Sequence, residues 1–129
     1  MHHVRSSGDA ARALAHFNHF HDAFLEAIAM RVVPESTEGF GFGLPVRHDV
    51  TLGFVHSNFS AAEADGSSER RIEMSLRRVT RMKLGDVVSA DNMLQECLIE
   101  VDANGTIHLD VGGDGLITFE CDALTIVES

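Results

Sequence analysis

The stretch of the chain with the most chemically active side chains is HFNHFHD, residues 16–22. It contains His16, His19 and His21, and Asp22 closes it. Imidazoles and carboxylates are zinc ligands and also the commonest proton-transfer groups. In a helix, His16 and His19 would share one face, and a sharp turn could bring His21 and Asp22 beside them. One hypothesis is therefore a metal-binding protein or metal-dependent hydrolase that uses these four residues.

A structural interpretation competes with the metal hypothesis. Asp9, Arg12, His16 and His19 follow one another at spacings of three or four residues, so in a helix they form one polar stripe. Such a stripe is typical of the solvated face of an amphipathic helix. The spacing H-x-x-H-x-H-D also differs from zinc motifs such as H-E-x-x-H. We therefore expect His16 and His19 to lie at the surface, and we assign no metal and no cofactor.

Phe20-His21-Asp22 lies where a predicted helix changes into a predicted strand. Asp22 is expected to accept hydrogen bonds from nearby backbone N–H groups, as Asp does in turns. His21 is expected to donate to a carbonyl or carboxylate and so fix the corner. We favour this structural role over catalysis because buried polar groups are usually satisfied locally. Three further histidines lie in or beside predicted strands and could approach His21 in space: His48, His56 and His108.

The elements that must position these residues begin with a predicted helix over about residues 7–20. Its apolar residues recur with helical spacing, and Ser6 can cap its first turn. Residues 23–33 alternate, end in β-branched residues and are followed by Pro34, which predicts a strand. A helix that continues through Met30 is the alternative, since this segment is rich in good helix formers.

The middle of the chain alternates between predicted loops and strands. Residues 34–49 hold both prolines and a GFGFG sequence, which predicts a loop; the glycine spacing does not fit a phosphate-binding loop. We expect Phe40 and Phe42 in this loop to cover the core; contact with a partner is the alternative. Residues 50–59 alternate as a strand does, and the small polar residues 60–70 indicate a second loop.

Residues 68–84 fit two structures. A strand with a change of phase near Arg78, as at a β-bulge, is preferred. A helix capped by Ser68 and ended by Gly85 also fits the spacing. This segment holds six of the ten Lys and Arg residues. It could bind anions or nucleic acid, but we expect a solvated strand face paired with acidic neighbours.

The last third of the chain shows clear hairpin signals. Strands are predicted over residues 93–101 and 106–111, joined by a turn that contains Asn104-Gly105, a strong hairpin signal. After a glycine-rich turn, residues 116–128 form a third strand with a bulge expected near Asp122. The sequence therefore predicts a single domain over residues 1–129. Its class is α+β, mainly β, with one N-terminal helix packed on a bent antiparallel meander of about six strands.

Composition limits the classes of partner. The formal net charge of −10 argues against nucleic acid and anionic membranes as partners and suits a basic protein partner.

Cys97 and Cys121 lie in apolar runs, so we expect reduced core thiols. The N-terminal residues lack the apolar region of a secretion signal, and no apolar run is long enough to span a membrane, so a cytoplasmic location is expected. An exposed sheet edge could pair with a second copy, which favours a homodimer.

The order of these motifs resembles a loose group of small bacterial proteins of unknown function. The resemblance is carried by Phe20-His21-Asp22 after a short helix, then by the IEMSLRRVTRMKL and ITFECDALTIVE strands. Some members of this group are similar to immunity proteins of toxin–immunity systems. The resemblance implies a mainly β fold and a binding role. We therefore expect a non-enzymatic binding protein, in the most specific form an immunity-type inhibitor of a basic toxin.

Overall fold

The computed structural model describes residues 1–35, 46–56, 69–85, 94 and 96–128. Within these residues the chain forms one α-helix, α1 (Ser7–His16), a 3-10 turn, η1 (Asn18–Phe20), and nine strands in two antiparallel sheets. The first sheet consists, in spatial order, of β1 (His2–Val4), β9 (Ala123–Glu128), β4 (Arg70–Arg77), β3 (Val46–His56) and β2 (Phe24–Pro34). The second consists of β5 (Arg81–Leu84), β8 (Ile117–Cys121), β7 (Ile107–Asp110) and β6 (Leu98–Val101).

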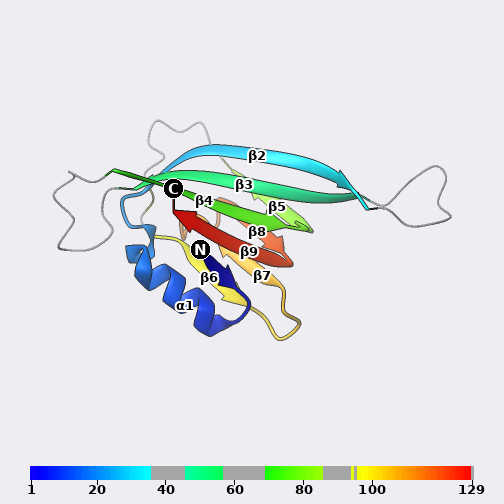
Figure 1. Cartoon of the computed structure of the whole chain (residues 1–129), viewed down its shortest axis with the longest axis horizontal. Helices are drawn as coiled ribbons and strands as arrows, with labels where there is room; N and C mark the ends of the chain where they lie inside the picture. The colour runs from blue at the N-terminus through cyan, green and yellow to red at the C-terminus, as the bar shows by residue number, and fades with distance from the viewer. Residues whose placement is uncertain (36–45, 57–68, 86–93, 95, 129) are drawn as a thin grey trace.

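The two sheets enclose one hydrophobic core, and α1 covers it on the side of β1 and β6 (Figure 1). Alternate residues of each strand point inward: Val50, Leu52 and Phe54 of β3 are buried, as are alternate residues of β4 and β9. The mainly β class with one N-terminal helix is therefore confirmed. The strand count is nine rather than about six, because two predicted strands are each divided between the sheets and β1 was not predicted.

Two sharp bends connect the sheets. β4 passes into β5 through Arg78, which has a left-handed φ of 56°, and β8 passes into β9 through Asp122. The Asp122 N–H donates to the Arg77 carbonyl at 3.1 Å, so the two bends lie side by side. The predicted phase changes near Arg78 and Asp122 are confirmed, and the helical alternative for residues 68–84 is wrong for the described part of that segment, which includes β4 and β5.

Helix α1 begins as predicted and ends four residues early. The Ser6 side chain accepts a hydrogen bond from the Asp9 N–H at 3.1 Å, and Ala10, Ala13 and Leu14 are buried. The predicted extension to residue 20 is wrong because the backbone turns left-handed after Phe17. His19 therefore does not continue the helical stripe of Asp9, Arg12 and His16.

Strand β2 is confirmed, with a bulge between Leu25 and Ala27 that the sequence pattern did not reveal. β3 begins at Val46, so the predicted loop over residues 34–49 is wrong for its last four residues. These residues pair with the far end of β2, for example Val46 with Pro34. The GFGFG sequence with Phe40 and Phe42, and residues 60–68 of the loop predicted over 60–70, lie outside the described residues. The loop prediction is wrong at its last residue, because Arg70 begins β4.

The β6–β7 hairpin is confirmed, but β6 begins at Leu98 rather than at residue 93. The predicted start is wrong because the Leu94 and Cys97 N–H groups donate to the carbonyls of Ala23 and His19 instead of to a strand partner. In the hairpin turn Gly105 has a φ of +81°, and Gly113 and Gly115 in the following turn each have +77°, values that favour glycine.

Two expectations drawn from composition also concern the described residues. Both cysteines are free and fully buried. Among the helices that the structure describes, none has the length and apolar character needed to cross a membrane.

Candidate functional site

The histidine-rich stretch forms a tight corner with unusual backbone geometry. Asn18, His19 and Phe20 have φ values of 50°, 55° and 58°, and Asp22 has 65°. Each left-handed non-glycine residue costs roughly 1–2 kcal/mol, so neighbouring interactions must hold this turn in place.

The residue that holds the corner is His56, at the end of β3. Its side chain is fully buried, and its Nε2–H donates to the Phe17 carbonyl at 2.8 Å. Its ring stacks on Phe20 with ring centroids 5.9 Å apart and an interplanar angle of 14°. Burial lowers the pKa of His56, which keeps the imidazole neutral near pH 7. Sequence reasoning named His56 only as a residue that could approach His21.

A signal for His56 was present in the sequence. Val50, Leu52 and Phe54 form the buried phase of β3, and His56 is the next residue in that phase. A histidine that continues an apolar phase is expected to be buried with a hydrogen-bond partner.

His21 and Asp22 lie at the surface of the corner, beside His56. The His21 Nδ1 is 3.3 Å from the Asp22 Oδ1, and about half of each side chain is exposed. The Asp22 N–H donates to the Leu94 carbonyl at 2.9 Å, so its backbone anchors the corner to the segment before β6.

His16 belongs to a different group of side chains. Its ring lies 4.7 Å from the ring of His2, and its Nε2 is 4.0 Å from the Glu128 carboxylate. His16 and His19 are both exposed. Within the described ranges, no three His, Cys, Asp or Glu residues are grouped so that they could hold a metal ion.

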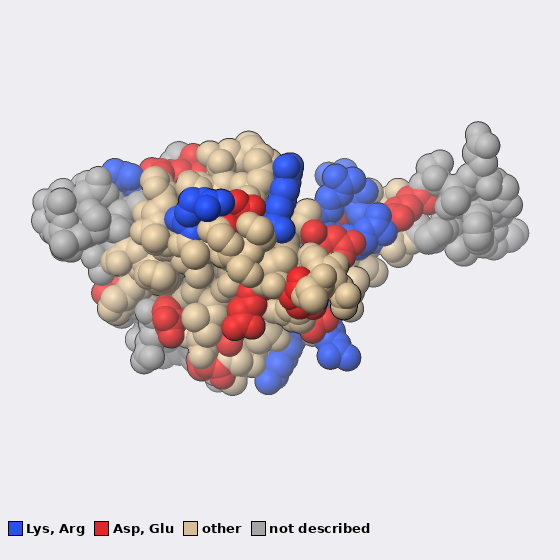
Figure 2. Space-filling view, turned by 90° about the horizontal axis from the view of Figure 1, so that it is seen from below, with Lys and Arg blue, Asp and Glu red and all other residues tan. Residues whose placement is uncertain are grey.

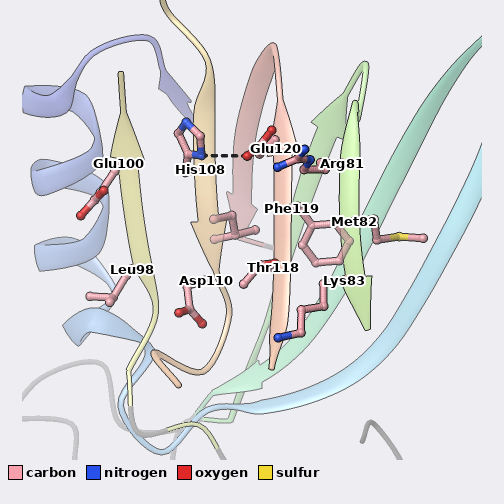
Figure 3. A pocket seen from close by; sticks show the side chains of 11 residues that line it. Arg81, Met82, Lys83, Leu98, Glu100, His108, Asp110, Thr118, Phe119 and Glu120 are labelled. Carbon is pink, nitrogen blue, oxygen red and sulfur yellow. Dashed lines mark ion pairs between the residues drawn. The ribbon is translucent and has the colours of Figure 1, made fainter. Parts of the chain in front are cut away.

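A second candidate site lies on the outer face of the second sheet, where a groove of about 520 Å³ crosses the four strands (Figure 3). Strand register places the side chains in two rows across this face. The first row is Arg81, Glu120, His108 and Glu100, and the second is Lys83, Thr118, Asp110 and Leu98. Adjacent strands are about 4.8 Å apart, so each row spans roughly 14 Å. Basic side chains therefore stand on β5 at one rim, and carboxylates extend across the other three strands.

His108 is the centre of the first row. Its Nε2 is 2.9 Å from the Asp102 Oδ2, and its Nδ1 is 3.4 Å from the Glu120 Oε1. The hydrogen bond to Asp102 raises the pKa of His108, with a further contribution from the charge of Glu120. Asp102 is itself fixed, because it accepts the N–H groups of Asn104 and Thr106.

Three charged groups in the groove have no ion pair or hydrogen bond with any residue that the structure describes. These are Arg81 and Lys83 on β5 and Glu100 on β6. Other basic residues of the run over residues 70–83 pair with acids: Arg70 with Glu128 at 3.0 Å, and Arg71 with Glu26. The predicted pairing of this run with acidic neighbours is thus confirmed for Arg70 and Arg71 of β4.

Comparison with known proteins leaves the family open. No protein-family model, no curated protein and no solved structure matches this chain.

Proposed function

We propose that this protein is a non-enzymatic binding protein that takes a basic segment of a protein partner into the groove of the second sheet. In its specific form it is an immunity-type inhibitor of a basic toxin, the role implied by the resemblance of the Phe20-His21-Asp22 signature. The observation that carries the proposal is the Glu100 carboxylate, which has no ion pair or hydrogen bond with the residues that the structure describes and which stands in one row with Glu120 across the groove.

The row supplies charge complementarity for a Lys or Arg side chain. Glu100 and Glu120 lie on either side of His108 in the strand register, so a cationic side chain above His108 would face both carboxylates. Charge-assisted hydrogen bonds of this kind are about twice as strong as neutral ones. Arg81 and Lys83 at the β5 rim favour an acidic residue in the same partner segment, which would set the direction in which that segment lies.

Binding fits the chemistry of the groove better than catalysis does. A general base needs a ring nitrogen within hydrogen-bond reach of the substrate, yet both nitrogens of His108 already face carboxylate oxygens. The thiols are also poorly placed as nucleophiles. Both are buried, and burial raises the pKa of Cys97 and raises that of Cys121 to about 12.

Overall charge supports a basic partner in a second way. The chain has 20 acidic residues against 10 basic ones, which attracts a cationic protein at long range. Figure 2 shows acidic side chains spread over the face seen from below and interspersed with Lys and Arg, without one single-signed patch. Specificity is therefore expected to come from the groove, and the net charge is expected to affect mainly the association rate.

The test compares three baits in pull-downs from native lysate: wild type, a Glu100→Gln/Glu120→Gln variant, and Glu73→Gln as a matched control. Glu73 is an exposed carboxylate on β4 of the other sheet, so its variant changes charge without touching the groove. The expected result is a basic protein that wild type and E73Q retain and that the double variant loses at least tenfold.

Equal retention by all three baits would contradict the proposed groove. Metal analysis of the untagged protein tests the rival hypothesis of a metal-binding protein or metal-dependent hydrolase. Stoichiometric zinc that is lost in His19→Ala would support a metal site at His16, His19, His21 and Asp22 and would count against a purely binding role.

A further inference from the structure

The described strands leave four sheet edges, and three of them are protected. β1, β5 and β6 are only three or four residues long, β5 carries Arg81 and Lys83, and α1 contacts β6. Short strands and edge lysines are the usual means by which proteins prevent edge-to-edge pairing. β2, at the opposite edge of the first sheet from β1, has eleven residues and is paired only with β3 (Figure 1).

The exposed side chains of β2 are mainly apolar. Met30 is 53% and Val32 is 55% exposed, and Ala27 and Ala29 are also exposed. The bulge before Ala27 and Pro34 at the other end are devices that end strand pairing. They enclose seven residues, 27–33, in which Arg31 is the one charge. Among the residues that the structure describes, no strand other than β3 pairs with this apolar edge.

Symmetry restricts how such an edge can pair with its own copy. An antiparallel pair of identical strands is related by a two-fold axis perpendicular to the sheet, which keeps each residue on the same face in both copies. Directly opposite residues point to the same face of the sheet. Beyond the bulge, residues on one face are either all even-numbered or all odd-numbered, so the two residue numbers of each opposite pair must add to an even number.

Charge and apolar contacts then select one register. β2 carries Glu26 and Arg31. Antiparallel pairing brings Glu26 of one copy beside Arg31 of the other when the residue numbers of each opposite pair add to 56 or to 58. A sum of 58 also places Ile28 opposite Met30, whereas a sum of 56 places Met30 opposite the bulged Glu26. Opposite charges and paired apolar side chains both stabilise a sheet. The axis then passes through Ala29, whose small side chain allows close approach.

We propose that two copies of this chain pair antiparallel through β2, centred on Ala29, so that the two five-stranded sheets form one continuous sheet of ten strands. Each copy contributes the same segment, so the interface is closed and does not propagate into a filament. The groove of the second sheet lies on other strands and stays accessible in both copies. The inference is therefore independent of the proposed function.

The first experiment measures mass by sedimentation velocity at protein concentrations from about 1 to 200 µM, a range chosen for a small interface of micromolar affinity. The wild type is expected to reach twice the chain mass of 14.1 kDa. Ala29→Lys places two ammonium groups at the axis and is expected to stay monomeric. Ala11→Lys, at an exposed position of α1, is the matched control and should behave as wild type. A wild type that stays monomeric throughout this range overturns the proposal.

The second experiment tests the register. Ala29→Cys would meet its own copy at a Cα separation of about 4.5–5.5 Å, within the range for a disulfide. The native thiols are buried, so they do not compete in the folded protein. Oxidation should cross-link A29C to a covalent dimer within minutes, and Val33→Cys, away from the axis, should react at least tenfold more slowly. A dimer that persists in A29K, or an A29C that does not cross-link, overturns the assignment to β2.

Discussion

His56 shows how one buried polar side chain can determine the course of a chain reversal. The left-handed residues 18–20 are costly, and the Phe17 carbonyl just before them accepts the Phe20 N–H at 3.0 Å within the turn. The imidazole of His56 donates to that carbonyl and stacks on Phe20. The corner is therefore fixed from β3, a strand 39 residues further along the chain.

Replacing the imidazole should destabilise the fold. His56→Phe keeps an aromatic ring beside Phe20 but removes the donor to the Phe17 carbonyl. The carbonyl keeps the Phe20 N–H, so the variant loses one buried hydrogen bond, which contributes about 0.5–1.5 kcal/mol. The free energy of unfolding, measured by urea denaturation at pH 7.5, should fall by that amount. His48→Phe, at an exposed position of the same strand, should change it by less than about 0.5 kcal/mol. Equal effects at both positions would show that the bond to Phe17 contributes nothing.

The same residue predicts a pH dependence with a definite sign. Burial lowers the pKa of His56 in the folded protein below its ordinary value of 6.5, so the unfolded chain binds more protons near and below that pH. The stability that His56 contributes is therefore largest above pH 6.5 and falls as the pH decreases. The stability difference between wild type and H56F should shrink between pH 7.5 and pH 5, as followed by urea denaturation. A difference that stays constant or grows would contradict a neutral buried imidazole.

Sequence reasoning at this scale found the corner, where His21 lies 3.3 Å from the Asp22 carboxylate, but it did not assign the buried His56 to it. The cluster at residues 16–22 attracted attention because its residues are adjacent in sequence. The partner of the corner comes from a distant strand, and only its phase with Phe54 indicates burial. Sequence proximity does not predict such a contact, because it depends on how β3 packs against the end of α1.

At the scale of elements, the turns were the most predictable parts of the chain. Gly105, Gly113 and Gly115 all take the left-handed conformation that their turn sequences demand. Asp110 accepts the N–H groups of Gly113 and Gly115, which fixes the turn between β7 and β8. The start of β6 was predicted too early, because apolar periodicity does not distinguish a strand from an irregular segment that is buried under a corner.

Two glycines of this turn provide a matched pair of variants. Both have a φ of +77°, so either substitution to Ala should cost about 1–2 kcal/mol of backbone strain. A Cβ at Gly113 would also lie 3.0 Å from the Glu96 Cγ, whereas a Cβ at Gly115 would meet nothing within 4 Å. Thermal unfolding should therefore show a larger loss of stability for Gly113→Ala than for Gly115→Ala. The reverse order would contradict the described packing of Glu96.

For the whole molecule, the sequence predicted the class but not the division into two sheets. The bulges near Arg78 and Asp122 were expected as local irregularities. In the structure they are the bends at which two long strands pass from one sheet to the other. A phase change in the sequence gives the position of a bend but not its angle. The same pattern of apolar residues therefore fits both a single bent meander and two packed sheets.

The enclosed core predicts the reactivity of the thiols. Cys97 and Cys121 are both fully buried, and burial raises the pKa of each. A disulfide-exchange reagent such as Ellman's reagent should therefore release little chromophore from the native protein at pH 8. It should release two equivalents after denaturation in urea. Rapid reaction of either thiol in the native protein would mean that the core opens locally at low cost.

The position of β9 in the first sheet has a consequence for folding kinetics. β9 lies between β1 and β4, and it pairs Ile126 with His2 near the opposite end of the chain. Contacts between residues so distant in sequence form only after a large loss of chain entropy, and proteins rich in them fold in milliseconds to seconds rather than microseconds. Until β9 docks, β1 and β4 each expose an unpaired edge. The first sheet is thus most prone to associate with other chains during the interval before its last strand is in place.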